Sequence, residues 1–418
     1  MQWLTRPLEY LEECAEELGT PFTLDLRHHG KYVFFADPRA VGEVLSAAPE
    51  KLVASRGNRV LRPLLGDSSL LLMEGEDHRR QRRLLGPAFQ KRRVMELEEG
   101  IRECTRRAME RWPEGEEFAF RDRMQEVSLE VILEVLLGAV GEGLAEELEE
   151  VFDELLNNPR YGLALLGRMD EEGGLSEAGK IGEAFERTKS RAGELVGEVI
   201  RERRERGEGG SSVLDLLLEC RDEEGGVASD EEVRDQLFTL IATGHETTAT
   251  ALAWAVYHVG GSEEVGRCVG KELEAEGEGP YLEAVCREVL RISPVVPVIA
   301  RWVAEPVEIA GVELPAGVTA SVAIHLAHRR GEVFEEPGEF RPERFLEKSY
   351  GATEYLPFGG ARRRCLGANL ALLEMKVVLG ELYRRFEVEV VEPEKVRPVR
   401  RLVTVGPSNG VRVVVRRA

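Results

Sequence analysis

"PFGGARRRCLG", residues 357–367, places three consecutive arginines directly before one cysteine, Cys365. Glycines lie on both sides of this cysteine, and a long apolar run follows it. Nearby positive charge lowers the pKa of a thiol, and so do the outward-facing N–H groups at the start of a helix. The stretch therefore predicts that Cys365 is a thiolate at the beginning of a helix.

A thiolate can serve as a nucleophile, as half of a redox disulfide or as a metal ligand, whereas most intracellular cysteines only fill space in the core. A nucleophile needs a histidine to activate it, and the seven histidines form no evident set around Cys365. The six cysteines include no C-x-x-C pair, so neither a zinc site nor a redox pair is indicated. A single thiolate on one metal remains, and haem iron is the metal that accepts one protein ligand.

Composition narrows the class of protein. The chain has 418 residues, of which 43% are hydrophobic and 32% charged, as in a globular protein. A net charge of −21 argues against a general nucleic-acid binder. Acidic residues occur near the N-terminus, where a signal peptide would have an apolar core. No stretch is uncharged for long enough to span a bilayer. We therefore expect a cytoplasmic protein that binds no membrane.

Helical periodicity dominates the chain, with apolar residues three and four apart in residues 36–52, 126–140, 184–207 and 229–259. Short strand-like stretches lie near the two ends, at residues 21–36, 308–317, 386–391 and 410–417. No internal repeat and no glycine fingerprint for a nucleotide is evident. The pattern predicts one domain over residues 1–418, mainly α with small peripheral β-sheets.

The long helix over residues 229–259 contains TGHETT, residues 243–248, where a glycine and an acid are poor choices for a buried helix. Either Glu246 and Thr247 meet water on an exposed face, or they serve a ligand that approaches the helix at Gly244. The segment EVLR, residues 288–291, ends another predicted helix and carries Glu288 and Arg291 on one face. FRPERF, residues 340–345, adds Arg344, and we expect these three residues to form one network.

These motifs resemble, in order and over nearly the whole chain, those of the cytochrome P450 family in its soluble bacterial form. FGGARRRCLG is similar to the haem-binding loop, TGHETT to the oxygen-activating segment, EVLR to the E-x-x-R pair and FRPERF to the segment that locks this pair. GEDHRRQRRLLGPAF, residues 75–89, is similar to the helix that binds a haem propionate. The resemblance implies the cytochrome P450 fold and a haem b (iron protoporphyrin IX) cofactor.

The resemblance also implies a role for each matching residue. Cys365 is the expected iron ligand, and Phe358 covers the thiolate. The expected partners of the two propionates are His78, Arg82, Arg301 and Arg363. Gly367 and Ala371 leave room for the porphyrin, and Thr243 and Gly244 lie on its other side. Glu246 and Thr247 are the expected catalytic residues, which guide protons to bound oxygen.

The implied activity is a monooxygenase that inserts one oxygen atom of O₂ into a small apolar substrate such as a fatty acid or terpene. Electrons then come from a ferredoxin or flavodoxin-type donor with its reductase, which the basic residues at 78–83 and 362–364 are expected to dock. The alternatives are a peroxide-driven enzyme of the same fold and a haem protein without turnover, such as a sensor or electron carrier. Two residues depart from the family pattern, Ala361 in place of glycine and Thr243 in place of alanine or glycine.

Overall fold

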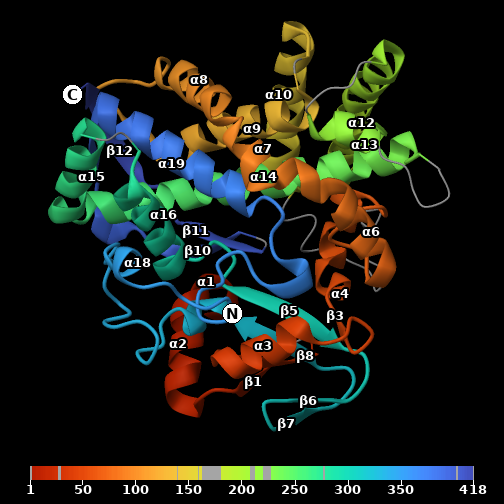
Figure 1. Cartoon of the computed structure of the whole chain (residues 1–418), viewed down its shortest axis with the longest axis vertical. Helices are drawn as coiled ribbons and strands as arrows, with labels where there is room; N and C mark the ends of the chain where they lie inside the picture. Colours follow the sequence, from red (N-terminus) through yellow and green to blue (C-terminus); the bar gives the residue numbers. More distant parts are fainter. Residues whose placement is uncertain are drawn as a thin grey trace. The chain divides into compact units, whose positions relative to one another are not determined.

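A computed structural model of the chain describes residues 2–26, 30–138, 140–158, 160–161, 180–207, 212–219, 227–275, 278–401 and 403–417. The described residues are mainly helical and carry small sheets, as expected (Figure 1). They fall into two compact units. The first unit comprises residues 1–53, 98–125 and 247–418, and the second comprises residues 54–97 and 126–246.

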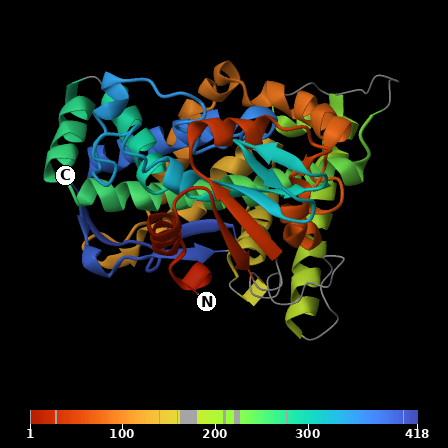
Figure 2. The ribbon, with the colours of Figure 1, turned by 90° about the horizontal axis from the view of Figure 1, so that it is seen from below.

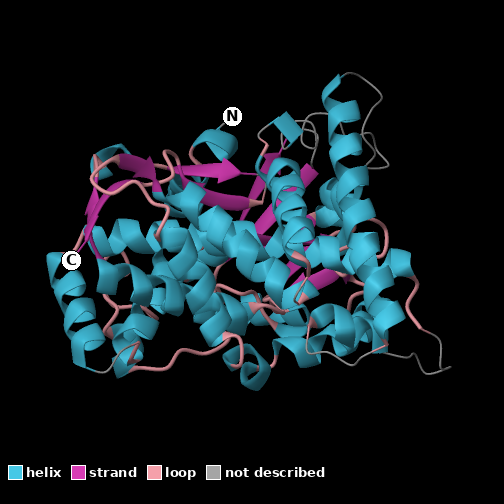
Figure 3. Cartoon of the chain, turned by 90° about the horizontal axis from the view of Figure 1, so that it is seen from above, coloured by secondary structure: helices cyan, strands magenta, loops and turns pink. Residues whose placement is uncertain are grey.

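The first unit holds the N-terminal and C-terminal helices and the strands. Its helices are α1 (Gln2–Thr5), α2 (Pro7–Leu18), α3 (Pro38–Ser46), α8 (Glu98–Met109), α15 (Glu263–Ala275), α16 (Pro280–Ile292), α17 (Ile324–Ala327), α18 (Arg344–Glu347) and α19 (Ala368–Arg385), with the 3₁₀ turns η3 (Ala361–Arg363) and η4 (Pro393–Lys395). Its strands are β1 (Phe22–Leu26), β2 (Gly30–Phe35), β3 (Leu52–Val53), β4 (Glu117–Ala119), β5 (Val298–Val303), β6 (Val307–Ile309), β7 (Val312–Leu314), β8 (Thr319–Ala323), β9 (Phe386–Val390), β10 (Pro398–Arg401), β11 (Thr404–Pro407) and β12 (Arg412–Arg417) (Figure 3).

The elements of the second unit are helices. Its elements are α4 (Ser55–Asn58), η1 (Arg59–Leu61), α5 (Arg62–Leu65), α6 (Gly75–Leu85), η2 (Gly86–Phe89), α7 (Lys91–Met95), α10 (Glu142–Asn157), α12 (Lys180–Arg206) and α13 (Val213–Glu219). Two helices belong to both units, α9 (Phe120–Leu137) and α14 (Asp230–Gly260). Among the described helices, none combines the length and the apolar character that crossing a membrane requires.

A five-stranded mixed sheet forms the β-rich part of the first unit, in the order β1-β2-β8-β5-β3, with β2 and β8 parallel and the other pairs antiparallel (Figure 2). Successive side chains of β2 point to opposite faces. Val33 and Phe35 join a buried cluster with Val41 of α3, whereas Phe34 joins one with Leu11 of α2. The sheet is therefore covered by α3 on one face and by α2 on the other.

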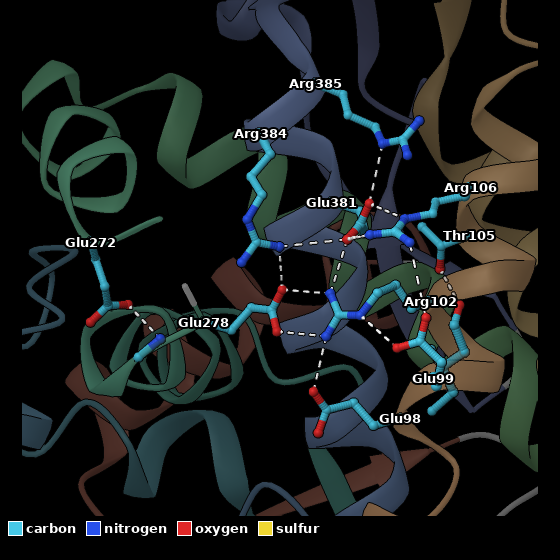
Figure 4. A network of polar contacts seen from close by, with 12 residues as sticks. Glu98, Glu99, Arg102, Thr105, Arg106, Glu272, Glu278, Glu381, Arg384 and Arg385 are labelled. Carbon is cyan, nitrogen blue, oxygen red and sulfur yellow. Dashed lines mark hydrogen bonds and ion pairs between the residues drawn. The ribbon is translucent and has the colours of Figure 1, made fainter. Parts of the chain in front are cut away.

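A cluster of charged side chains fixes α19, the helix that follows Cys365, to α8 (Figure 4). Glu381 of α19 is almost fully buried and accepts hydrogen bonds from Arg102 Nη1 at 2.9 Å and from Arg106 Nε at 2.8 Å. Arg102 also donates to Glu278 at 2.7 Å. Burial alone raises the pKa of Glu278, but the bonds from Arg102 and Arg384 outweigh it and lower this pKa to about 2. The cluster is therefore ionised at neutral pH.

Three histidines of the first unit are uncharged: His325 and His328, which are buried, and His258, which is partly buried. Burial, with the nearby charge of Arg291, lowers the pKa of His258 to about 3 and the pKa of His328 to about 3. Burial also lowers the pKa of His325, although Glu12 Oε1 lies 2.7 Å from its Nε2. Their neutral rings favour the folded state above the unfolded pKa of about 6.5, and this stability is lost as the pH falls below that value.

Candidate functional site

The structure places Cys365 in an exposed loop between η3 and the start of α19. Its backbone N–H donates to the carbonyl of Phe358 at 2.8 Å, and the N–H of Gly359 donates to the carbonyl of Leu356 at 2.9 Å. These two bonds close the segment 356–365, which we call the cysteine loop, on itself. The thiol is thus presented at the surface by a backbone of defined shape, next to a helix N-terminus as expected.

Ala361 holds a left-handed backbone conformation with φ of 50°, and Gly359 has φ of 64°. An L side chain in this region costs about 1–2 kcal/mol, which glycine does not incur. The family pattern has glycine at the position of Ala361 for this reason. The departure noted in the sequence therefore leaves the turn in place and adds local backbone strain.

The cysteine loop also brings together several of the expected cofactor residues. Phe358, Arg363, Gly367 and Ala371 all lie in the loop or the first turn of α19, and each is partly exposed. A Cβ atom on Gly359 would lie 3.9 Å from Ile299 Cδ1 of β5. Arg301 lies two residues further along β5 and so on the same face as Ile299. Its Nη1 donates to the carbonyl of Ala300 at 2.8 Å.

The expected network of Glu288, Arg291 and Arg344 is confirmed. Glu288 and Arg291 on α16 are completely buried, and the guanidinium donates from Nε to Glu288 Oε2 and from Nη2 to Oε1, both at 2.7 Å. Arg344 Nε donates to Glu288 Oε1 at 3.1 Å, and the backbone N–H of Arg341 donates to the same oxygen at 2.9 Å. Paired and fully hydrogen-bonded in this way, the charges are stable in the interior.

In the second unit, α6 presents the expected pair of residues on one face. His78 is 6% exposed, and Arg82, four residues later, is partly exposed. The neighbouring Arg79 and Arg83 both pair with Glu76, with Arg79 Nε at 2.9 Å and Arg83 Nη2 at 3.0 Å. The basic island at residues 78–83 is therefore partly neutralised by an acid that precedes it.

The α14 helix is buried on either side of residues 242–247, but Thr243, Gly244, Glu246 and Thr247 are partly exposed. Because Thr243, Glu246 and Thr247 are three and four residues apart, they share one face. The middle of the helix thus carries a polar, partly exposed face. The hydroxyl of Thr243 donates to the carbonyl of Thr239 at 2.7 Å, so its proton is held by its own helix.

The α14 helix is α-helical without interruption through residues 243–248. Close packing explains why position 244 is a glycine. A Cβ atom at this position would lie 2.9 Å from Ile132 Cδ1 of α9, closer than real contacts allow. The glycine therefore permits close packing of α9 against α14 within the second unit.

A clasp that the sequence did not reveal ties residues 66–70 to the first half of α14, one to two turns before Thr243. Asp235 Oδ2 accepts the N–H of Ser68 at 3.0 Å, and Gln236 Oε1 accepts the N–H of Leu70 at 3.2 Å. The hydroxyls of Thr239 and Ser69 lie 2.8 Å apart. Burial raises the pKa of Asp235. These contacts join residues more than 160 positions apart, so no local sequence pattern predicts them.

The donor set suits one haem group better than a metal held by protein alone. No cluster of three or more His, Cys, Asp or Glu side chains that could hold a metal ion occurs within the described ranges. The first unit holds the exposed thiol of Cys365, which is a soft donor, and the partly buried guanidinium groups of Arg301 and Arg363, which are of the type that binds carboxylates. Small residues, Gly367 and Ala371, follow the thiol at the start of α19, and no protein atom lies within 4 Å of a Cβ placed on Gly367.

Comparison with known proteins agrees with this chemistry. The cytochrome P450 family profile matches residues 1–412. The putative cytochrome P450 135B1 of Mycobacterium bovis is 34% identical over 421 residues, covering 99% of this chain and 88% of that protein. The putative cytochrome P450 137 of Mycobacterium tuberculosis is 34% identical over 409 residues, covering 96% and 84%.

Solved structures share the fold. Cyanobacterial CYP120A1 with retinoic acid bound has a TM-score of 0.84 at 22% identity, covering 98% of this chain and 94% of that chain. The haem domain of cytochrome P450DA has a TM-score of 0.83 at 23% identity, covering 99% and 93%. The chain therefore belongs to the cytochrome P450 family of haem-thiolate monooxygenases.

Proposed function

We propose that this protein uses haem b to insert one oxygen atom of O₂ into a small apolar substrate, such as a fatty acid or terpene. The observation that carries the proposal is the exposed thiol of Cys365 in its hydrogen-bonded loop at the start of α19. In P450 enzymes the thiolate ligand donates electron density to the haem iron and so favours cleavage of the O–O bond. The other residues bind, orient and deliver protons.

In this proposal each partner of the two propionates is assigned through the family motifs. Arginine suits this task because its planar fork donates two parallel bonds to a carboxylate. Arg301 and Arg363 are partly exposed. His78 and Arg82 share one face of α6 and serve the same purpose. Phe358 shields the thiolate, and Gly367 and Ala371 keep the porphyrin side free of bulky atoms.

Glu246 and Thr247 are the proposed proton donors at the oxygen-binding side. Both are partly exposed, whereas the next residue, Thr248, is buried. Glu246 is a carboxylate that exchanges protons with solvent, and Thr247 Oγ1 holds the proton at the point of use. Thr243 lies on the same helix face, but its hydroxyl is occupied by the carbonyl of Thr239.

The substrate class rests on the apolar residues beside these motifs. In the second unit Leu71, Leu72 and Met73 are partly exposed at the end of the segment 57–73. In the first unit Val296 and Val298 are partly exposed where the chain enters β5. The arginine at position 62 pairs with Asp67, so it is not reserved for a substrate carboxylate. Apolar walls of this kind favour an apolar substrate.

The proposed electron donor is a ferredoxin or flavodoxin with its reductase. Arg362 and Arg364 are exposed on the cysteine loop, in a protein whose net charge is −21. An acidic donor is attracted to such a local basic site, and this attraction weakens with salt. Peroxide-driven chemistry and a haem protein without turnover are the alternatives.

The test compares Thr247→Ala with Thr248→Ala, a matched change at the adjacent buried position. In haem-loaded Thr247→Ala we expect NAD(P)H oxidation to continue while product per NAD(P)H falls and hydrogen peroxide is released. General acid–base catalysis contributes about 10²–10⁴-fold, which sets the scale of the lost coupling. Glu246→Gln is expected to slow turnover itself. Unchanged coupling in a haem-replete Thr247→Ala protein would contradict the proposal and favour peroxide-driven chemistry or a protein without turnover.

A further inference from the structure

His328 lies between the buried ion network and the cysteine loop, and the activity derived so far assigns it no role. It follows α17 directly and is completely buried. Its backbone N–H donates to the carbonyl of Ile324 at 2.9 Å, which completes the last turn of that helix. The imidazole therefore projects from a fixed point of the backbone.

His328 and Arg291 hold each other through two reciprocal contacts. The guanidinium of Arg291 donates from Nη1 to the carbonyl of His328 at 2.9 Å. In return, Nδ1 of His328 lies 3.2 Å from the carbonyl of Arg291. Because Arg291 is also bound to Glu288 at both carboxylate oxygens, the histidine is anchored to the most completely buried ion pair of the described chain.

The second ring nitrogen of His328 reaches the cysteine loop. Nε2 lies 2.9 Å from the backbone nitrogen of Leu356, the first residue of that loop. A backbone N–H can only donate, so Nε2 is the acceptor and carries no proton. The proton is therefore on Nδ1, where it points at the carbonyl of Arg291. The ring works as a bridge in one tautomer, with its donor on the ion network and its acceptor on the loop.

The surroundings keep the bridge in this form. Tyr355 stacks on the imidazole with centroids 5.4 Å apart, and Phe334 meets it edge-on at 6.2 Å. The hydroxyl of Tyr355 donates to the carbonyl of Arg287 at 2.9 Å, which anchors the residue before Leu356 to α16 as well. Burial and the charge of Arg291 lower the pKa of His328 to about 3, so the acceptor persists at physiological pH.

From Leu356 the fixed geometry continues to the thiol through the backbone. The carbonyl of Leu356 accepts the N–H of Gly359 at 2.9 Å, and the carbonyl of Phe358 accepts the N–H of Cys365 at 2.8 Å. Between these bonds the chain passes through the left-handed residues Gly359 and Ala361. Ala361 resists this conformation, so the loop needs an anchor at its entrance to keep its shape.

We propose that His328 is a positioning residue for Cys365, acting through its Nε2 acceptor on Leu356 to hold the loop in the shape that directs the thiolate. This role rests on the proposed function of Cys365 as the iron ligand. Groups that orient a metal ligand typically matter about 10–100-fold for retention of the metal. We expect an effect of that size on the rate at which haem leaves the protein.

The discriminating pair of variants is His328→Asn and His328→Gln. An asparagine amide reaches about as far as Nδ1, so it keeps the contact with Arg291 and loses the acceptor for Leu356. A glutamine amide extends to the position of Nε2 and restores that acceptor. His258→Leu is the control, because burial also lowers the pKa of His258 and its Nε2 lies 2.8 Å from Ser293 Oγ, outside the cysteine loop.

Haem-loaded proteins are compared by the Soret band of the reduced carbon monoxide complex, by haem transfer to apomyoglobin and by reduction potential. We expect His328→Asn to shift part of the protein from the red-shifted thiolate band to a shorter wavelength and to release haem about 10–100-fold faster. His328→Gln should restore both properties, and His258→Leu should match the parent. Equal behaviour of Asn and Gln variants, or an equal change in His258→Leu, would overturn the positioning role. A parent without the thiolate band would instead overturn the proposed function.

Discussion

Replacing Arg291 with lysine keeps the positive charge of the buried ion network but removes its hydrogen-bond geometry. All five N–H groups of this guanidinium have partners, two bonds going to Glu288 and the others to the carbonyls of His328, Pro337 and Glu339. A lysine ammonium has three donors on a flexible stem. At least two of these five hydrogen bonds are therefore lost in the Arg291→Lys protein.

The magnitude follows from the burial of the acceptors. A hydrogen bond to a charged group contributes about 1.5–3 kcal/mol, so two lost bonds cost about 3–6 kcal/mol. Breaking a buried ion pair costs about 3–5 kcal/mol, which lies within the same range. We therefore expect Arg291→Lys to lower the free energy of unfolding by about 3–5 kcal/mol.

The assay is urea unfolding of the haem-loaded protein, followed by far-ultraviolet circular dichroism and by haem absorbance. The matched control is Arg287→Lys, one turn earlier on α16, whose partner Glu283 lies in an exposed pair. Exposed pairs contribute less than about 1 kcal/mol, so the control should stay close to the parent. A loss below about 1 kcal/mol in Arg291→Lys, or equal losses in both variants, would refute the hydrogen-bond reasoning.

Three further outcomes are expected from the same unfolding assay. Ala361→Gly should stabilise the protein by about 0.5–1 kcal/mol because it relieves the left-handed backbone, whereas Gly359→Ala should destabilise it by about 1 kcal/mol; equal effects would contradict the conformational argument. Glu381→Gln should cost about 3–5 kcal/mol, since it leaves buried arginine donors without an anionic partner, and the surface change Glu389→Gln should cost less than about 1 kcal/mol. Between pH 7.5 and 5.5 the free energy of unfolding should fall by about 3 kcal/mol, because His258 and His328 take up protons in the unfolded state but stay neutral in the folded state, where their pKa is near 3. A flat profile over this window would contradict their neutral state.

The parts of the site that the sequence predicted are those encoded over short distances. Glu288 and Arg291 are three residues apart on one helix, and the FRPERF motif places Arg344 within reach of them. Apolar residues three and four apart predict the helix over residues 229–259, and α14 spans Asp230–Gly260. The strands expected at residues 21–36, 308–317, 386–391 and 410–417 are confirmed by the hairpins β1–β2 and β6–β7 and by β9 and β12.

What the sequence did not reveal depends on contacts between distant segments or on residues without a pattern. The strand β8, Thr319–Ala323, is buried along its whole length, so it lacks the alternation that marks a half-buried strand. The clasp of Asp235 on Ser68 and the fit of Gly244 against Ile132 arise only when the helices pack. His328 stands in an ordinary polar stretch, and only its two ring partners identify it.

The central claim is that Cys365 is the single thiolate ligand of a haem iron. The most direct measurement is the absorption spectrum of the reduced protein with carbon monoxide, recorded for the parent, for Cys365→Ala and for Cys268→Ala as a control at a partly exposed cysteine of α15. We expect the red-shifted Soret band of a thiolate-ligated haem in the parent and in Cys268→Ala, and its loss in Cys365→Ala. A Cys365→Ala protein that keeps this band would contradict the claim.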